Sequence, residues 1–390
     1  MENSNRIKNL PPYLFAEIDK MINNAKSEGM DVINFGIGDP DQPTPKNIVN
    51  KMREAVQDPT THSYPSYEGL VEYRKAVSNY YKDRFDVNLD PNTEVVSLIG
   101  SKEGIAHLPL CYINPGDCAL IPDPGYPVYK TSILLANGNT IMVPLKNENG
   151  FLPDLANIAV ESAEKAKIFF LNYPNNPTGA VASLDFFKEV IAFAKKYNII
   201  VAHDAAYTDI YLDKHVPHSI LKVEGAKDVA VEFNSLSKPF NMTGWRIGWA
   251  CGNKDVVEAL GRLKTNIDSG IFEAIQYAGI EALSNSKKSI IEMRKLYKKR
   301  RDLIVDGLAE LGWNIKTNKA TFYLWVEVPE NTTSSEFSKK LFKKTGVFFT
   351  PGIGWGEYGE SYLRIALTVK SNRIKEAINR IEESNFIYNT

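Results

Sequence analysis

Short apolar runs alternate with helix-like amphipathic segments from about residue 35 to residue 255 of this chain. Apolar runs of this kind, bounded by turn residues, are typical of buried strands. Strands that alternate with helices form mostly parallel sheets with helices on both faces, so the pattern predicts an α/β fold. The runs expected to form strands are 95–99, 119–121, 140–145, 166–171, 198–202, 229–233 and 247–252.

The rest of the chain predicts a second, smaller domain. The 390 residues are too many for one compact core and fit two closely packed domains. A long helical region runs from residue 254 to about 311 with a break near 268–270, and further strands are expected at 321–328 and 361–367. We expect an N-terminal arm and part of the small domain in residues 1–45, the large domain in 46–285 and the rest of the small domain in 286–390.

Composition and charge argue against several classes of protein. The net charge is -1, so no polyanionic partner is expected. Basic residues cluster at 298–301 on the long helical region, where a solvated helix face is the expected interpretation. Three cysteines, a small and odd number, argue against a disulfide framework and for a reducing compartment. No Cys-x-x-Cys pair or histidine cluster offers a metal site.

The sequence has no pattern typical of membrane or secreted proteins. A membrane-spanning helix needs about 18 apolar residues in a row, and no run approaches that length. The segment from Met1 to Arg6 lacks the apolar core of a signal peptide. We therefore expect a cytoplasmic protein.

One stretch between two expected strands combines hydroxyl groups with cations. Ser235 and Ser237 precede Lys238, and Arg246 follows eight residues later. Arginine offers a planar fork of donors and serine a short donor, which together suit a phosphate dianion. A lysine that is screened from water can lose its proton and form a Schiff base with a carbonyl. These needs converge on pyridoxal 5'-phosphate (PLP), whereas Lys238 taken alone would also fit an ordinary exposed loop.

This stretch resembles the cofactor-lysine motif of the class I/II (fold type I) PLP-dependent aminotransferases, and the similarity runs from about Leu10 to the end of the chain. The segments 10–20, 36–41 and 265–270 are most similar to the branch that acts on LL-diaminopimelate. The resemblance implies a large domain with a mostly parallel seven-stranded sheet between helices. It also implies a smaller α+β domain built from both ends of the chain.

A buried carboxylate at the end of an expected strand gives the cofactor a second anchor. Asp204 follows two residues after the run 198–202, at the C-terminal end of this expected strand. A carboxylate buried there is costly unless it meets a cation. A protonated pyridine nitrogen supplies that cation. The resemblance adds Asn176 and Tyr207 at the phenolate oxygen of PLP and Tyr126 stacked on its ring. A metal interpretation of this strand end lacks a third ligand.

The phosphate site implied by the resemblance draws on several segments. The turn at Ser101 and Lys102 follows an expected strand and begins a helix, whose free N–H groups and dipole favour an anion. In the family a tyrosine crosses a dimer interface to the phosphate, and Tyr64 matches it, with Tyr67 as a competitor. The full set is Ser101, Lys102, Ser235, Ser237 and Arg246, with Tyr64 from a neighbouring subunit.

The substrate side is also assigned through the resemblance. Arg364 interrupts an apolar alternation, and a buried arginine needs an anion. The matching arginine of the family grips the substrate α-carboxylate, together with a backbone N–H at the position of Gly38. Gly36 and Gly38 are not a dinucleotide fingerprint, because the third glycine and the following helix are missing. Further substrate contacts are expected from Tyr13, Lys102, Tyr126 and Asn176.

The resemblance implies a homodimeric PLP-dependent aminotransferase. Its most similar branch exchanges an amino group between LL-diaminopimelate with 2-oxoglutarate and tetrahydrodipicolinate with glutamate. Aminotransferases for aspartate, alanine, aromatic residues or methionine remain alternatives, as does a PLP-dependent carbon–sulfur lyase on the same fold. A PLP-binding transcription regulator would need a separate basic DNA-binding module. The enzyme-like region leaves no room for one in this chain.

Overall fold

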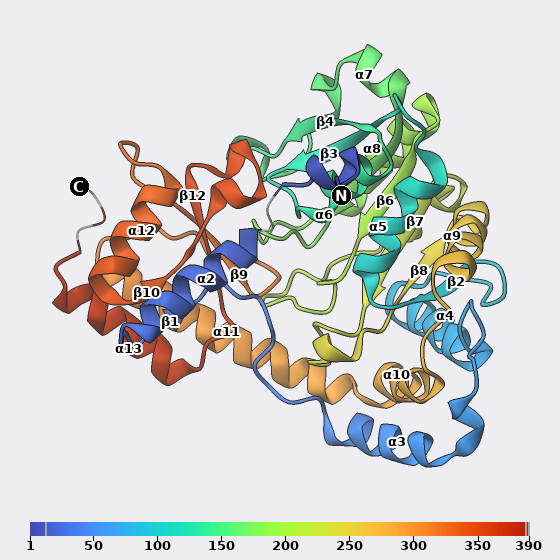
Figure 1. The fold of residues 1–390 in the computed structure, drawn as a ribbon, viewed down its shortest axis with the longest axis horizontal. Helices are drawn as coiled ribbons and strands as arrows, with labels where there is room; N and C mark the ends of the chain where they lie inside the picture. Colours follow the sequence, from blue (N-terminus) through green and yellow to red (C-terminus); the bar gives the residue numbers. More distant parts are fainter. Residues whose placement is uncertain (12–13, 387, 389–390) are drawn as a thin grey trace.

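The computed structural model describes residues 1–11, 14–386 and 388, and a seven-stranded sheet dominates this part of the chain (Figure 1). Its strands are β2 (Val95–Leu98), β3 (Cys118–Asp123), β4 (Asn139–Pro144), β5 (Ala166–Asn172), β6 (Ile200–Asp204), β7 (Ala230–Ser235) and β8 (Gly248–Gly252). The strand order is β2-β8-β7-β6-β5-β3-β4. Within this sheet β8 runs in the opposite direction to the other six strands. The predicted mostly parallel sheet is confirmed.

Both faces of this sheet are buried, which explains why its strands are continuous apolar runs. In β5, Phe169 and Leu171 join one hydrophobic cluster, while Ile168 and Phe170 join another on the opposite face. Successive side chains of a strand point to opposite faces, so the consecutive positions from Ile168 to Leu171 are all apolar. The first cluster includes α3 (Lys46–Gln57), α4 (Val71–Phe85), α8 (Leu184–Tyr197) and α10 (Glu273–Asn285); the second includes α5 (Ser101–Tyr112), α6 (Val128–Leu135) and α9 (Lys254–Ile267).

A separate three-stranded antiparallel sheet lies on the other side of the molecule. It has the order β11-β12-β9, from β9 (Tyr323–Glu327), β11 (Thr350–Pro351) and β12 (Tyr362–Ala366). The short strand β1 (Ile33–Asn34) pairs with β10 (Val347–Phe348), so a segment near the N-terminus joins the C-terminal part (Figure 1). This is the smaller α+β unit expected from both chain ends. Its helices are α2 (Leu14–Ser27), α12 (Ser334–Thr345) and α13 (Ser371–Glu383).

The long helical region is divided into α9, α10 and α11 (Lys287–Glu310). The predicted break at 268–270 is confirmed, and a further break at Ser286 was not predicted. Figure 1 shows α11 running from beside α10 toward the smaller sheet. The expected solvated face at 298–301 is wrong for Arg300 and Arg301, which are buried. Their guanidinium groups pair at 2.7 and 2.8 Å with carboxylates far away in the sequence, Asp41 and Asp213 respectively.

The remaining α-helices of the described residues are short. They are α1 (Asn5–Lys8) and α7 (Val160–Lys165). In the described part of the chain, no helix has the combined length and apolar character that crossing a membrane requires.

Candidate active site

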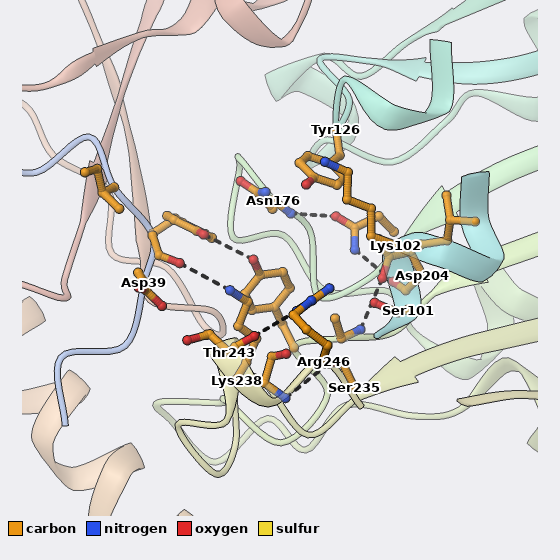
Figure 2. A pocket seen from close by; sticks show the side chains of 18 of the residues that line it. Asp39, Ser101, Lys102, Tyr126, Asn176, Asp204, Ser235, Lys238, Thr243 and Arg246 are labelled. Atoms are coloured by element: carbon orange, nitrogen blue, oxygen red, sulfur yellow. Dashed lines mark hydrogen bonds between the residues drawn. The ribbon is translucent and has the colours of Figure 1, made fainter. Parts of the chain in front are cut away.

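The carboxyl ends of β5, β6 and β7 open into a cavity of about 330 Å³, whose far wall comes from the smaller sheet (Figure 2). The cavity brings together twelve of the residues predicted from the sequence, although they come from distant segments. They are Gly38, Ser101, Lys102, Tyr126, Asn176, Asp204, Tyr207, Ser235, Ser237, Lys238, Arg246 and Arg364. Their roles toward a cofactor or substrate stay predictions.

Lys238 lies in the turn that follows β7, and its amine points into the cavity. Nζ donates to the backbone oxygen of Gly38 at 3.3 Å. Burial lowers the pKa of Lys238 to about 8; the charge of Asp39 opposes this shift, and the charges of Arg364 and Arg246 reinforce it. A much larger fraction of this amine is therefore neutral near neutral pH than for an exposed lysine, which is what a nucleophile or base needs.

Arg246 and the start of α5 form a donor-rich corner of the cavity. The guanidinium donates to the backbone oxygen of Thr243 at 2.8 Å and to that of Ile99 at 3.4 Å. A Cβ atom at Gly100 would lie 2.5 Å from Nη2 of Arg246, and the φ of Gly100 is +77°. Only glycine allows the arginine to approach the helix N-terminus at Ser101 this closely. Cationic and backbone N–H donors therefore converge, as an anion site requires.

Two buried serines extend this corner along the end of β7. The backbone N–H of Ser237 donates to Oγ of Ser235 at 3.1 Å, and Oγ of Ser235 lies 3.4 Å from the backbone oxygen of Ile247. Both serines line the cavity next to Arg246. Hydroxyl donors thus stand beside the guanidinium, the combination that suits a phosphate.

Asp204 lies at the floor of the cavity, at the end of β6. Burial raises the pKa of this carboxyl, and hydrogen bonds from Tyr129 and the backbone of Ala206 oppose the rise. Tyr129 donates to Oδ2 at 2.8 Å and the N–H of Ala206 to Oδ1 at 3.4 Å. These donors carry no charge, so a cationic ring nitrogen in the cavity would supply the charge partner that a buried carboxylate needs.

Arg364 projects from β12, lines the cavity and is almost completely buried. Nη1 donates to Oδ1 of Asn176 at 2.9 Å and Nη2 to the backbone oxygen of Gly36 at 2.7 Å. The guanidinium lies between two aromatic rings, 4.2 Å from Tyr323 and 4.3 Å from Trp355. Rings and hydrogen bonds hold the planar fork in one orientation.

Tyr323 also accounts for the glycine at position 38. A Cβ atom there would lie 1.9 Å from the Tyr323 oxygen, so only glycine fits. The hydroxyl groups of Tyr323 and Tyr207 are 3.1 Å apart, and burial raises the pKa of both phenols. Both side chains therefore stay neutral and keep a donor for the cavity or for each other.

Tyr126 and Lys102 also line the cavity, and Figure 2 shows them close to each other. The Lys102 ammonium lies 5.9 Å from the centre of the Tyr126 ring, which packs edge-on against Tyr129 at 6.0 Å. Tyr126 thus presents an aromatic surface to the cavity, whose predicted use is to stack on a cofactor ring.

Two of the predicted tyrosines lie in an exposed loop of this chain. Tyr64 is 88% exposed and Tyr67 is 48% exposed, and neither lines the cavity. That location fits a side chain meant for a neighbouring subunit, so the prediction for Tyr64 stays open. Tyr13 lies outside the described residues.

The cavity also contains residues that the sequence did not reveal. Asp39 follows directly on Gly38, and Thr243 belongs to the same stretch as Lys238 and Arg246, so their positions carried a local signal. Tyr323 lies in a correctly expected strand, but no sequence pattern indicates that its ring reaches Arg364. The complete set of unpredicted lining residues is Ile37, Asp39, Ile105, Asn172, Ala206, Thr243 and Tyr323.

Comparison with known proteins identifies the family to which the chain belongs. The family model for aminotransferase class I and II matches residues 30–381. The chain belongs to the class I and II aminotransferases. A relative from Halothermothrix orenii, named LL-diaminopimelate aminotransferase, is 68% identical over 384 residues, which cover 98% of this chain and 99% of that protein. A relative of the same name from Moorella thermoacetica is 54% identical over 98% of each chain.

This aminotransferase has the same fold as proteins of known structure. Substrate-bound BacF from Bacillus subtilis has a TM-score of 0.96 at 37% identity, covering 100% of this chain and 99% of that chain. The predicted fold type I is confirmed. The family depends on PLP, which confirms the predicted cofactor.

The residues that line the cavity have the chemical groups that PLP requires. Asp204 is a buried carboxylate whose hydrogen-bond donors are uncharged, which suits a protonated ring nitrogen. Gly100 leaves a space beside Arg246 that a Cβ atom would fill, which suits a phosphate. Lys238 supplies an amine of lowered pKa that lines the same cavity as these two groups.

Proposed function

We propose that this aminotransferase interconverts LL-diaminopimelate plus 2-oxoglutarate with tetrahydrodipicolinate plus glutamate. The observation that carries the substrate assignment is the 68% identity, over nearly the whole of both chains, to a relative named for this reaction. The cavity supports it in general terms, because the charged side chains of Arg364, Lys102 and Asp39 line it, and a substrate with two carboxylates and two amino groups can contact such groups.

In this proposal PLP is held at both ends. The phosphate would bind to Arg246, Ser235, Ser237 and the N-terminal turn of α5 at Ser101 and Lys102. Asp204 would pair with the pyridine nitrogen and favour its protonated form. Asn176 and Tyr207 would donate to the phenolate oxygen, and Tyr126 would stack on the ring.

When bound, PLP supplies an electron sink for the charge that develops on the substrate α-carbon. Nζ of Lys238 takes the proton from that carbon, which requires a neutral amine, and the lowered pKa of Lys238 provides one. The backbone oxygen of Gly38 keeps Nζ inside the cavity. The enclosing walls limit the access of water to the reacting atoms.

Arg364 orients the substrate by its α-carboxylate. Its planar fork can form two parallel hydrogen bonds to a carboxylate, and the rings of Tyr323 and Trp355 fix the plane of that fork. The backbone N–H of Gly38 is the second donor. Every amino acid has an α-carboxylate that an arginine can bind in this way. Arg364 therefore supports an amino acid as the class of substrate and does not identify the individual substrate.

The proposed active unit is a homodimer with shared active sites. Exposed rings and aliphatic side chains gather near the loop at Tyr64, including Tyr67, Ile267 and Phe272. The two segments that carry them are in contact, since a Cβ atom at Gly270 would lie 2.7 Å from the backbone oxygen of Ser66. A second copy of the chain would bury this surface and bring Tyr64 to the neighbouring phosphate.

The same proposal includes a cytoplasmic location and a division into three segments. Residues 1–45 form an arm and part of the small domain, 46–285 the large domain, and 286–390 the remainder of the small domain. The hydrogen-bonded pairing of β1 with β10 and the separate sheets support this division.

The test compares amino donors under one set of conditions. LL-diaminopimelate with 2-oxoglutarate is assayed against aspartate, alanine, phenylalanine and methionine. We expect the highest kcat/KM for LL-diaminopimelate. A value higher by more than about tenfold for any of the other four, roughly 1.4 kcal/mol of transition-state preference, contradicts the substrate assignment. Pyruvate and ammonia released from cystathionine in place of a new amino acid would instead identify a carbon–sulfur lyase.

A further inference from the structure

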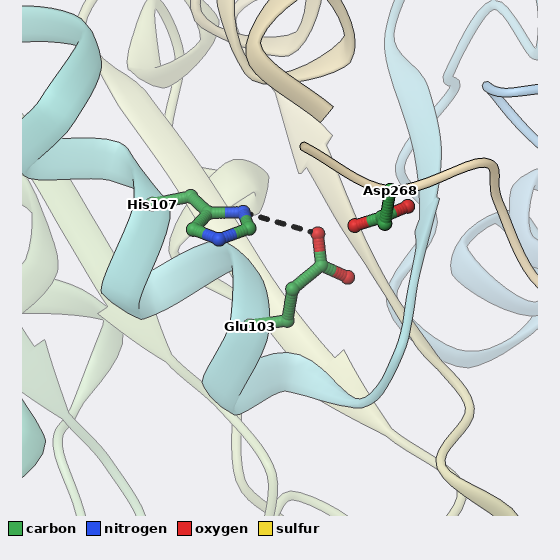
Figure 3. A group of neighbouring side chains, drawn as sticks. All are labelled: Glu103, His107 and Asp268. Atoms are coloured by element: carbon green, nitrogen blue, oxygen red, sulfur yellow. Dashed lines mark ion pairs between the residues drawn. The ribbon is translucent and has the colours of Figure 1, made fainter. Parts of the chain in front are cut away.

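A partly buried group of charged side chains lies next to the phosphate corner, at the start of α5. Glu103 and His107 project from α5, and Asp268 follows α9 (Figure 3). Their potential ligand atoms all lie within 4.8 Å of one another. The ammonium of Lys264, which is 1% exposed, lies 2.6 Å from Asp268 Oδ1 and 3.3 Å from Glu103 Oε2. The lysine therefore takes the place of a cation between two carboxylates, which argues for an ion-pair network here and against a metal site.

Glu103 connects this network to the phosphate corner. Its Oε2 accepts a hydrogen bond of 2.6 Å from the backbone N–H of Ile99. The backbone oxygen of Ile99 accepts a hydrogen bond from Arg246 at 3.4 Å. Gly100 and Ser101 come directly after Ile99 in the chain. The carboxylate thus fixes the peptide from which the phosphate-binding turn departs.

Asp268 connects the network to the loop that carries Tyr64. Its Oδ1 also accepts from the backbone N–H of Gly270 at 3.0 Å. A Cβ atom at Gly270 would lie 2.7 Å from the backbone oxygen of Ser66, so the turn 268–270 packs closely against that loop. Ser66 is two residues beyond Tyr64.

We propose that Lys264 is a positioning residue that holds two parts of the phosphate site in register. Through Glu103 it sets the turn at 99–101 of its own subunit, and through Asp268 it sets the loop that presents Tyr64 to the partner subunit. Without its charge, two carboxylates lie close together without the cation that compensates them, and they separate. The inference rests on the proposed phosphate site and dimer.

The first test is retention of PLP by the holoenzyme of Lys264→Met. We expect roughly tenfold or faster loss of PLP on dilution, followed by the visible absorption of the bound cofactor. Lys264→Arg, which keeps the charge, should restore most of the retention. Lys227→Met is the matched control, because Lys227 pairs with Glu94 at 2.7 Å in the same large sheet region but away from the cavity. Circular dichroism establishes that each variant is folded; if Lys264→Met does not fold, Glu103→Gln takes its place.

The second test is a double-mutant cycle with Tyr64→Phe. If Lys264 positions the loop of Tyr64, the two substitutions together weaken PLP binding by less than the product of their separate effects. Independent effects contradict the link to that loop. Unchanged retention in Lys264→Met contradicts the whole inference, provided that Arg246→Ala loses PLP. If Arg246→Ala also retains PLP, the proposed phosphate site is wrong, and the inference that rests on it is overturned with it.

Discussion

Arg364 and Asn176 are joined by a hydrogen bond of 2.9 Å, although 188 positions separate them in the sequence. Asn176 follows a strand of the large sheet, and Arg364 lies in the smaller sheet. The bond therefore connects the proposed carboxylate grip with the proposed donor to the cofactor ring. If these proposed roles hold, this one contact couples the orientation of the substrate to that of the cofactor ring across the two parts of the molecule.

Replacing Arg364 by lysine removes the planar fork while keeping the charge. A lysine ammonium cannot form two parallel hydrogen bonds or stack in the same way between Tyr323 and Trp355. We expect kcat/KM to fall roughly 100-fold for every amino donor, about 2.7 kcal/mol, with most of the change in KM. Arg373→Lys is the matched control, since Arg373 pairs with Asp31 near the surface. Equal effects of the two substitutions in a steady-state assay contradict the grip.

Replacing Gly100 by alanine places a methyl group against Arg246. The Cβ atom would lie 2.5 Å from Nη2, and the residue also has a positive φ. We expect PLP affinity to fall by roughly tenfold or more, measured by equilibrium titration. Gly116→Ala separates the two causes, because Gly116 has φ +96° but no atom within 4 Å of the added Cβ. If both variants bind PLP alike, Gly100 does not shape the phosphate corner.

The large sheet and much of the cavity were predictable for different reasons. The sheet was predictable because both of its faces are buried, so strands such as β5 carry an unbroken apolar run, here Ile168 to Leu171. Lys238 and its serines combine chemistries that few local structures need. The roles of Asn176 and Gly38 came from family resemblance, since asparagine and glycine are common in turns that have no catalytic or binding role.

Contacts between distant segments were not predictable from the sequence. Tyr323 lies in a correctly predicted strand, yet its neighbours depend on how the two sheets face each other. The basic run ending at Arg301 suggested a solvated face, because the carboxylates of Asp41 and Asp213 become its partners only in the folded chain. A charge pattern records composition along a helix and does not record what packs against it.

Covalent attachment of PLP to Lys238 should depend on pH. Burial lowers the pKa of Lys238 to about 8, so attachment should become faster as pH rises through about 8 and then level off. The folded apoprotein also binds fewer protons at this site than the unfolded chain between about pH 8 and 10.5, so its stability should rise across that window. Stopped-flow absorbance measures the first effect and thermal unfolding the second.

Replacing Asp39 offers a second test of this pH dependence. Its negative charge raises the pKa of Lys238, so Asp39→Asn should move the midpoint for PLP attachment to a lower pH. Asp228→Asn, which alters an exposed pair with Lys195, should leave the midpoint unchanged. A midpoint near 10 in the unmodified protein would rule out the buried amine as the attacking group.

Tyr64 and Tyr67 form a natural matched pair, because both are exposed in the same loop. If Tyr64 reaches the phosphate of a partner subunit, Tyr64→Phe should weaken PLP retention several-fold, while Tyr67→Phe should not. Sedimentation should show a dimer at assay concentration. Full activity from a monomer, or the larger effect at Tyr67, would contradict the assignment.

The position at which the cofactor is attached to the chain decides whether Lys238 has the proposed role. Borohydride reduction of the holoenzyme, followed by proteolysis and mass spectrometry, should find the phosphopyridoxyl group on Lys238. Lys238→Ala should remain folded, lose turnover and give no adduct at that position. A reduced adduct on any other lysine of the active protein would contradict the assignment of Lys238 as the anchor and base of this site.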